Sequence, residues 1–228
     1  MKANSTTPTA VSRPAAGRSS LHVRPLYTPE EDAEFDRLLG KHHYLGESRP
    51  VGDFLRIVVE QDGQWAALFT FGSACYALGP RDERIGWTKT LLAERQKLVV
   101  QNRRFCLLGD PGENPNLASQ CLGAMARELP RIWQKRFGYT PLLLETFSDP
   151  EASAGTCYKA ANWEPAGLSK GNSRHTAQRF IPNESPKKLW LKLLCPDAIE
   201  RLCAERAQGS VQVFEHNKAF LRLHLRQP

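Results

Sequence analysis

An acidic residue, Glu145, closes a strongly apolar run. Leu142, Leu143 and Leu144 predict a buried strand, and Glu145 follows them directly. Open α/β sheets bind ligands at the carboxyl ends of their strands, so an acid at that point is placed for ligand contact or acid–base chemistry. The alternative is a structural carboxylate that is hydrogen-bonded to the backbone or paired with Arg104. The residues alone leave both interpretations open.

A cysteine and a pair of histidines are the other side chains suited to catalysis. Cys157 lies near the start of an expected short helix, where the helix dipole would lower the pKa of a thiol. A nucleophilic cysteine also needs a base, and His42 or His43 would serve only if the fold brings it to the thiol. The alternative for Cys157 is a small packed residue. The loop His42-His43-Tyr44 is suited to base or phosphate contacts, acid–base work or a structural hydrogen bond.

Three further groups of side chains have both a ligand-binding and a structural interpretation. Asn116 and Ser119 flank the start of a long helix, where they would cap it or contact a ligand at the same end. Trp87 would stack on a flat ligand or pack in the core. Arg103 and Arg104 precede a buried strand, where they would bind a phosphate or pair with the acid described above.

Positive charge is concentrated at the two ends of the chain. The net charge is +7; the first 22 residues hold three basic residues and no acid, and residues 170–228 hold 11 basic and 5 acidic residues. Basic segments attract nucleic acid through phosphate contacts, and a solvated tail is the alternative. If the chain binds DNA or RNA, the expected contacts are Lys170, Arg174, Lys187 and Lys188.

The composition indicates a folded protein of a reducing compartment. None of the six cysteines forms a CxxC pair or has zinc-finger spacing with histidines, so no metal site is expected. No apolar run reaches membrane-spanning length, and the Ser-, Thr- and Pro-rich first 20 residues lack the apolar core of a signal peptide. We therefore expect a cytoplasmic protein without a membrane partner.

The first half of the chain predicts a helix, a hairpin and a second helix. Thr28 is a candidate N-cap for a helix from Pro29 to Leu39, which Gly40 would end. Strands at 54–59 and 65–71 are separated by Asp62-Gly63, a strong hairpin signal. A loop containing Pro80, Arg81 and Asp82 and a helix near 90–98 are expected to follow.

The second half predicts alternating strands and helices. A helix from Leu117, kinked or divided at Pro130, would end at Gly138. The other expected elements are strands at 104–108, 141–147, 164–167 and 187–194 and helices at 156–161 and 196–207. This order predicts an α/β fold with a mixed sheet flanked by helices. We divide the chain into a disordered leader (1–22), one domain (23–195) and a basic extension with a helix and a strand (196–228).

Short motifs between Arg24 and Leu194 resemble the DruA-like family, named for the Druantia anti-phage system. They are His43–Gly46, Val51–Gly52, Ile85–Trp87, Pro115–Ser119, Leu144–Phe147 and Gly155–Trp163. Members of this family occur in defence loci and beside transposase genes, which implies work on or near DNA. Where the family has Asn-Asn-Ser-Arg before a strand, this chain departs from the pattern with Gln101–Arg104. Asn102 and Arg104 are candidate ligand contacts. The family's Gly- and Arg-rich stretch corresponds here to Ser169–Arg174.

The same region is similar in pattern to GNAT acyltransferases, which implies a GNAT-like fold. By that resemblance Tyr158 is the general acid that protonates a leaving thiolate, Glu145 is a candidate base, and Asn162 follows in the turn after the helix. The resemblance also implies CoA, but the loop Asp110–Asn116 disfavours it. Its prolines donate no N–H, and Asp110 and Glu113 would repel phosphate. The cofactor therefore stays open.

Three functions are compatible with these residues. The first is an anti-phage or mobile-element-associated protein that acts on or near nucleic acid with a GNAT-like scaffold. The second is a CoA-dependent N-acyltransferase with Tyr158 as acid and Glu145 as base. The third is a non-catalytic subunit that recruits other proteins of a defence complex.

Overall fold

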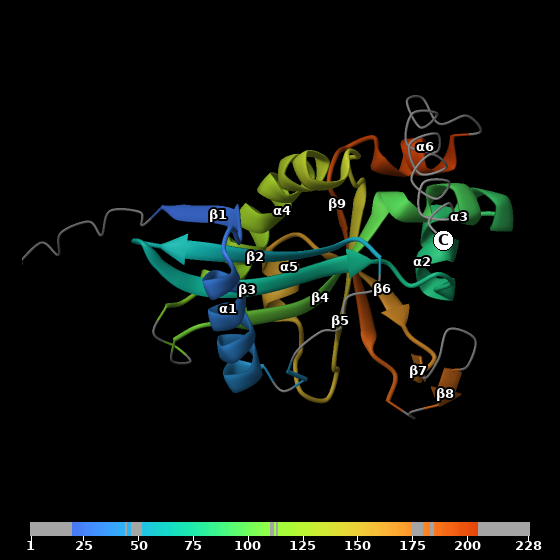
Figure 1. Ribbon diagram of the computed structural model, residues 1–228. Helices are drawn as coiled ribbons and strands as arrows, with labels where there is room; N and C mark the ends of the chain where they lie inside the picture. The colour runs from blue at the N-terminus through green and yellow to red at the C-terminus, as the bar shows by residue number, and fades with distance from the viewer. Residues whose placement is uncertain are drawn as a thin grey trace, which may run out of the picture.

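A mixed sheet of seven strands forms the centre of the molecule, in the order β1-β2-β3-β4-β5-β9-β6. The computed structural model describes residues 20–43, 45–46, 52–109, 112, 114–174, 180–182 and 185–204. Only β4 and β5 run parallel; every other neighbouring pair in the sheet is antiparallel. The strands are β1 (Leu21–Pro25), β2 (Phe54–Gln61), β3 (Gln64–Ser73), β4 (Val99–Leu107), β5 (Leu143–Ser148), β6 (Glu164–Leu168) and β9 (Lys188–Leu193). The predicted mixed sheet is confirmed (Figure 1).

Helices cover both faces of this sheet, and a separate hairpin stands beside it. The hairpin pairs β7 (Asn172–Arg174) with β8 (Phe180–Pro182). The helices are α1 (Pro29–His42), α2 (Gly79–Ile85), α3 (Lys89–Arg95), α4 (Leu117–Phe137), α5 (Thr156–Ala160) and α6 (Ala198–Cys203), with a 3-10 turn at Gln96–Leu98. None of the helices in the described ranges combines the length and apolar composition needed to cross a bilayer. Within the same ranges, no three His, Cys, Asp or Glu side chains gather as a metal site would require.

The first helix begins where predicted but ends later. The Thr28 hydroxyl caps α1 by accepting the Glu31 N–H at 3.2 Å. The helix then continues through Gly40 to His42, so Gly40 is not the predicted stop. Phe35 and Leu39 hold α1 against the sheet, because both are buried with residues of β2, β3 and β4.

The predicted hairpin is confirmed, and a further strand precedes it. Asp62 and Gly63 both adopt positive φ, of 52° and 79°, in the turn between β2 and β3, as a two-residue hairpin turn requires. We did not predict β1, which pairs with β2 from Leu21 onward. Its first two residues lie in the segment that we assigned to the leader.

The segment around Pro80 is a helix and not the predicted loop. Pro80 lies in the first turn of α2, where its missing N–H leaves no bond unmade. Gly86 ends α2 in the left-handed conformation, and Thr88 caps α3 by accepting the Leu91 N–H. The predicted helix near 90–98 is thus α3 followed by the 3-10 turn.

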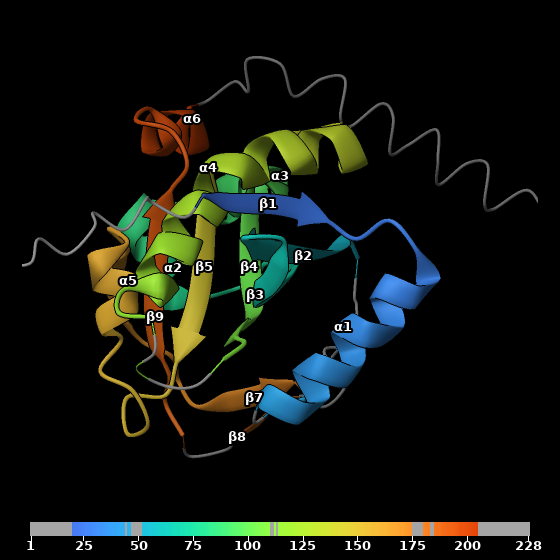
Figure 2. The same cartoon turned by 90° about the vertical axis from the view of Figure 1, so that its left-hand side faces the viewer.

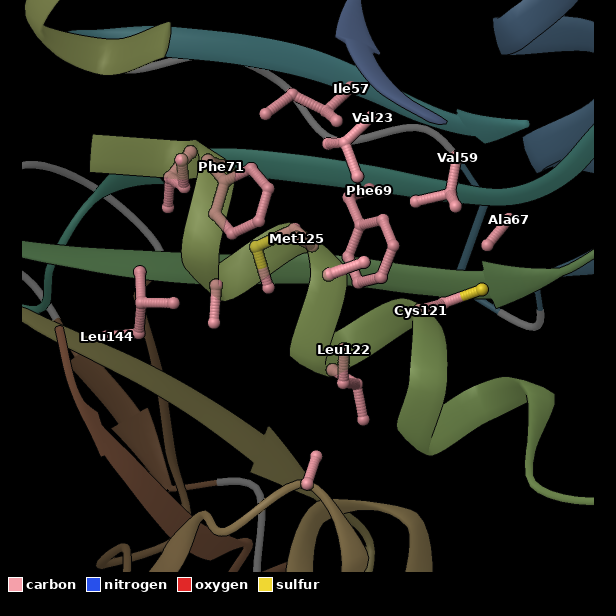
Figure 3. Packing of buried hydrophobic residues seen from close by; sticks show 14 of the residues in the cluster. Val23, Ile57, Val59, Ala67, Phe69, Phe71, Cys121, Leu122, Met125 and Leu144 are labelled. Carbon is pink, nitrogen blue, oxygen red and sulfur yellow. The ribbon is translucent and has the colours of Figure 1, made fainter. Parts of the chain in front are cut away.

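The longest helix, α4, is continuous. Pro130 lies within it without dividing it, so a division at Pro130, one of the two predicted effects, is wrong; Gly138 ends the helix as predicted. Cys121, Leu122 and Met125 pack against β2, β3 and β5 residues in the largest apolar cluster (Figure 3). The face of the sheet beneath α4 and α5 is called the α4 face below.

The opposite face, here called the α1–α2 face, carries two smaller apolar clusters. One lies beneath α1, and the other lies beneath α2 and α6. Figure 2 shows α4 and α1 on opposite sides of the strands, and Figure 1 shows α6 beside α3. The Trp87 indole donates to the Leu202 carbonyl at 2.9 Å, and Arg95 donates to the Arg201 carbonyl at 2.9 Å. The start of the predicted extension therefore packs on the domain.

Candidate functional site

The two parallel strands pair over only part of their lengths. Pairing of β4 with β5 runs from Val99 opposite Leu143 to Asn102 opposite Thr146. Beyond this point β4 continues to Leu107 beside β3, and β5 continues to Ser148 beside β9. The two parallel strands thus separate beyond this point, and their facing edges no longer pair with each other. We call this point, at Asn102 and Thr146, the β4–β5 fork.

A buried amide without a hydrogen-bond partner lies at the β4–β5 fork. The Asn102 side chain is 2% exposed, and neither its Oδ1 nor its Nδ2 has a partner among the described residues. The Thr146 hydroxyl donates to the Asn102 backbone carbonyl at 3.0 Å and leaves the amide untouched. Leaving a buried polar group unsatisfied costs about 1–3 kcal/mol. Such a group indicates a place where a ligand with amide or carbonyl groups would bind.

The predicted acid, Tyr158, lies beside the fork on the α4 face. Its ring stacks on Trp190 with centroids 5.5 Å apart, and Trp163 meets it edge-on at 5.6 Å. Trp190 is the partner of Thr146 in the β5–β9 ladder. Adjacent strands lie about 4.8 Å apart, so Asn102, Thr146 and Trp190 form a row that leads to Tyr158.

The predicted base, Glu145, lies on the other face. Leu144 belongs to the cluster beneath α4 and Leu143 to the cluster beneath α2, so strand alternation places Glu145 on the α1–α2 face. Its carboxylate is fully buried, accepts the Cys75 N–H at 2.9 Å and pairs with Arg81 at 2.8 Å. Burial raises the pKa of Glu145, and the Arg81 charge opposes that shift.

Two sequence hypotheses are decided by this arrangement. The partner of Glu145 is Arg81 and not Arg104, which donates to the Gly46 and Arg103 carbonyls at 3.1 and 2.8 Å. The structure also does not bring Glu145 and Tyr158 together, because the sheet lies between them. An acid–base pair made of these two side chains would have to act from opposite sides of the fork.

Arg81 makes several hydrogen bonds and ion pairs that the sequence did not predict. Besides Glu145, it donates to the carbonyls of Cys75 and Tyr76 and to Asp82, and its guanidinium lies over the Trp87 ring at 5.4 Å. Burial alone would lower the pKa of Arg81, but the charges of Glu145 and Asp82 outweigh it and raise the pKa. Trp87 is half-buried and packs against the cluster beneath α2.

The remaining catalytic candidates, Cys157 and His43, lie apart. Cys157 packs against the cluster of the α4 face, whereas His43 follows α1 and its ring lies near Arg104. Burial raises the pKa of Cys157, which favours the neutral thiol. Burial, assisted by the Arg104 charge, lowers the pKa of His43 to about 4, and its Nδ1 accepts the Leu45 N–H at 3.1 Å. Tyr44 lies outside the described residues.

A hollow of about 1070 Å³ begins at the N-terminal end of α4. Asn116 occupies the capping position with φ 68°, but its side chain makes no capping bond; instead the Ser119 hydroxyl donates to its carbonyl at 2.9 Å. Ser119 and Asn162, both predicted ligand contacts, line the hollow. The polar residues of its lining include Asn114, Gln120, Arg127 and Lys192. Asp110 and Glu113, on which the argument against CoA rests, lie outside the described residues.

Three of the predicted nucleic-acid contacts, Lys170, Lys187 and Lys188, lie on neighbouring segments, because the Ser169 N–H donates to the Lys187 carbonyl at 2.8 Å. Lys187 pairs with Asp149, and the Lys188 ammonium lies over the Trp190 ring at 4.7 Å. Lys170 is exposed. Arg174 belongs to β7, and its side chain lies outside the described part of the chain.

Three residues at these sites were missed from the sequence. Arg81 was assigned to a loop, although Pro80 just before it and Gly86 five residues after it are helix start and stop signals. Thr146 was overlooked beside Glu145, although alternation along a strand places the two on opposite faces. Cys75 has no sequence signal for its role, because it contributes its backbone N–H and carbonyl.

Solved acetyltransferase structures share this fold. The chain matches the aminoglycoside acetyltransferase AAC(6')-Ib with ribostamycin and coenzyme A at 14% identity and a TM-score of 0.50, covering 82% of this chain and 99% of that chain. The same enzyme with coenzyme A alone also gives 14% identity and a TM-score of 0.50, over 80% and 98% of the two chains. These matches establish a GNAT-like fold. No curated protein sequence matches the chain.

A family model establishes the relationship by sequence. The model described as Druantia protein DruA matches residues 12–181, which is most of the chain. The match includes β1, the β4–β5 fork, α4 and the Tyr158 helix, and it ends before β9. The chain therefore belongs to the DruA family of Druantia proteins.

Proposed function

We propose that this protein serves anti-phage defence as an acyltransferase that moves an acyl group from a CoA-type thioester to an amine. Membership of the DruA family supports the defence context. The observation that carries the chemistry is the unpartnered Asn102 amide at the β4–β5 fork, on a GNAT-like scaffold. The proposal also places the protein in the cytosol.

The described residues fit such a donor. Its amide-containing arm would bind the separated edges of β4 and β5 and the Asn102 side chain, whose donor and acceptor groups have no partner among the described residues. Its phosphates would lie at the N-terminal end of α4, where Ser119 and Gln120 line the hollow, with Arg127 farther along the helix. When bound, the donor supplies a thioester carbonyl that is open to attack by an amine.

The transfer forms a nitrogen–carbon bond and breaks a carbon–sulfur bond. One proton leaves the amine and one is taken up by the departing sulfur. Tyr158 is the group placed to supply the second proton, because its ring is fixed by Trp163 and Trp190 beside the fork. Glu145 instead orders the α1–α2 face through Arg81, so water is the simplest carrier for the proton of the amine.

The test separates donor binding from transfer. A ligand that binds the native state raises the melting temperature by mass action. We expect acetyl-CoA to stabilise the wild type, Tyr158→Phe and the control Tyr27→Phe, whose side chain is exposed, but not Asn102→Leu. Acetyl transfer to a panel of amines should be lost in Tyr158→Phe and kept in Tyr27→Phe. No stabilisation of the wild type by acetyl-CoA or CoA would overturn the proposal.

A second candidate function is action on nucleic acid, which the basic charge of residues 170–228 favours. The division into leader, domain and basic extension belongs to this proposal, with the two ends as the binding segments. The full chain would then bind DNA or RNA with an affinity that falls steeply with salt. Binding independent of salt, or none, would remove this candidate and leave recruitment of other defence proteins as the alternative to catalysis.

A further inference from the structure

A β-bulge in β4 turns two consecutive arginines toward the same face. Asn102 pairs with Phe71 and Arg104 pairs with Thr70, so Arg103 is an extra residue with no partner in β3. Phe71 and Phe105 pack in the cluster of the α4 face, which places Asn102 on that face. A bulge interrupts the alternation of side chains, and here Arg103 joins Arg104 on the α1–α2 face.

The Arg103 side chain lies flat on the sheet. A Cβ atom built on Gly72 would lie 3.0 Å from Arg103 Cδ and 3.4 Å from its Nη1, so glycine makes room for the side chain. The guanidinium is half-buried, and burial lowers the pKa of Arg103. No hydrogen bond or ion pair to this guanidinium comes from the part of the chain that the structure describes.

Three other half-buried or buried arginines are neutralised by two carboxylates each, and the buried Arg95 donates to the Arg201 and Ala204 carbonyls. Arg24 pairs with Glu31 and Glu60. Arg56 pairs with Asp32 and Asp36. Arg81 pairs with Asp82 and Glu145. Arg103 departs from this pattern, although a guanidinium removed from water without an anion is unfavourable.

The surroundings of Arg103 favour an oxyanion. Next to it in the chain, Arg104 is fixed by the Gly46 carbonyl and adds a second positive charge. Thr70, the ladder partner of Arg104, is 1% exposed, and its hydroxyl has no partner among the described residues. The carboxylate of Glu145 on the same face is already bound by Arg81. A guanidinium with a second positive charge beside it suits a phosphate or carboxylate group.

Arg103 follows Asn102, which lies at the β4–β5 fork. Asn102, on the α4 face, and Arg103, on the α1–α2 face, are consecutive residues at the point where β4 and β5 part. We infer that Arg103 binds an oxyanion, a phosphate or a carboxylate, carried by the amine that receives the acyl group. This assignment of the anion to the acceptor rests on the proposed function, but binding of the anion itself does not.

Anion binding is measured first, on the full chain without any donor. Inorganic phosphate and acetate are titrated by calorimetry into the wild type, Arg103→Gln and Arg103→Lys. The control is Arg84→Gln, an exposed arginine paired with Glu164; Arg127→Gln instead reports binding in the hollow at α4. We expect at least a tenfold loss of affinity in Arg103→Gln, a smaller loss in Arg103→Lys, and wild-type binding in Arg84→Gln.

Other outcomes of the titration overturn the inference. Binding that disappears in Arg127→Gln and persists in Arg103→Gln would place the anion in the donor hollow. Phosphate binding of equal strength in all variants, or none in the wild type, would show that Arg103 is not an anion site. Misfolding is checked by the melting temperature of Arg103→Gln, which should equal or exceed that of the wild type because a desolvated cation is removed.

Acyl transfer then identifies the acceptor. O-phosphoethanolamine, β-alanine and ethanolamine carry an amine with a phosphate, a carboxylate and no anion, respectively. We expect Arg103→Gln to raise KM for the better anionic acceptor at least tenfold, with little change in kcat and no change for ethanolamine. Equal effects on all three acceptors would overturn the assignment. Arg103-dependent phosphate binding without acetyl-CoA binding would keep the anion site and reject the proposed function.

Discussion

Glu145 and Arg81 form an ion pair of 2.8 Å on the α1–α2 face, and neither side chain has any exposed surface. The pair connects β5 to α2, and it also fixes the chain after β3 through both backbone groups of Cys75. A buried pair of this kind is held by its own hydrogen bonds, since the desolvation of both charges must be offset. The pair therefore determines how α2 sits on the sheet.

Arg81→Met should destabilise the protein strongly. It leaves the Glu145 carboxylate buried without its partner, and breaking a buried pair in this way costs about 3–5 kcal/mol. The matched control is Arg84→Met, in the exposed pair with Glu164, for which about 0–1 kcal/mol is expected. Urea unfolding measures both free energies. Equal losses in the two variants would show that the buried pair has no special role.

The double variant Arg81→Met, Glu145→Leu should recover part of that loss. Replacing both charges with apolar side chains removes the unpaired carboxylate, although the bonds of Arg81 to the carbonyls of Cys75 and Tyr76 stay broken. The measurement is again the free energy of unfolding in urea. A double variant less stable than Arg81→Met would mean that Glu145 contributes mainly through the Cys75 N–H.

Asn102→Leu should stabilise the protein while it removes acetyl-CoA binding. The substitution replaces a buried amide that has no partner in the described ranges with an apolar side chain of similar size, so a gain of about 1–2 kcal/mol is expected. Asn102→Asp, which buries a charge in the same volume, should lower the free energy of unfolding. If Asn102→Leu destabilises the protein instead, the amide has a structural partner and the fork loses its main evidence for a ligand.

The sequence predicted Glu145 as a candidate functional residue, but it did not show which face of β5 carries the side chain. Leu142 to Leu144 are all buried, because helices cover both faces of the sheet. Such strands lack the alternation of polar and apolar residues that reveals which side chain faces which way. The sequence therefore predicted the strand and the acid at its end. The face of the sheet on which Glu145 lies became clear only from the packing of α2.

The β-bulge at Arg103 is a second feature that could not be predicted from the sequence. One extra residue shifts the phase of all later side chains, and nothing in the run Gln101–Arg104 marks where the shift occurs. Arg103 and Arg104 were therefore predicted as one group, but the first has no partner among the described residues and the second is bonded to Gly46. Local signals such as the Thr28 cap and the Asp62-Gly63 turn were predictable, because each depends on neighbouring residues only.

Acidification should destabilise the protein through His43. Burial and the Arg104 charge lower the pKa of His43 from 6.5 to about 4. The unfolded chain then binds a proton on this side chain at a higher pH than the folded chain does. The contribution of His43 to stability is thus complete above pH 6.5 and is lost as the pH falls toward about 4.

Unfolding in urea at a series of pH values measures this loss. His43→Gln should flatten the fall in stability between pH 6.5 and about 4. The matched control is His42→Gln, because His42 is the exposed neighbour of His43 in the chain, and this variant should keep the wild-type profile. Parallel profiles for the wild type and His43→Gln would show that other groups cause the fall.

Gly155→Ala tests the stack that fixes Tyr158. A Cβ atom at Gly155 would lie 2.2 Å from Cζ2 of Trp190, and the residue has φ 68°. The control is Gly138→Ala, with φ 82° and no atom within 4 Å of the added carbon. Each variant should lose about 1–2 kcal/mol through its left-handed backbone. Only Gly155→Ala should lose about 1–3 kcal/mol more, because Trp190 must move in a packed core.

The free energies of unfolding of these two glycine variants in urea measure the difference. Since Trp190 carries the stacked ring of Tyr158, Gly155→Ala should also reduce acyl transfer, whereas Gly138→Ala should not. If both variants lose the same free energy of unfolding and have the same acyl-transfer activity, Trp190 moves aside without a free-energy cost. In that case the position of Tyr158 would depend on Trp163, the other ring that contacts it.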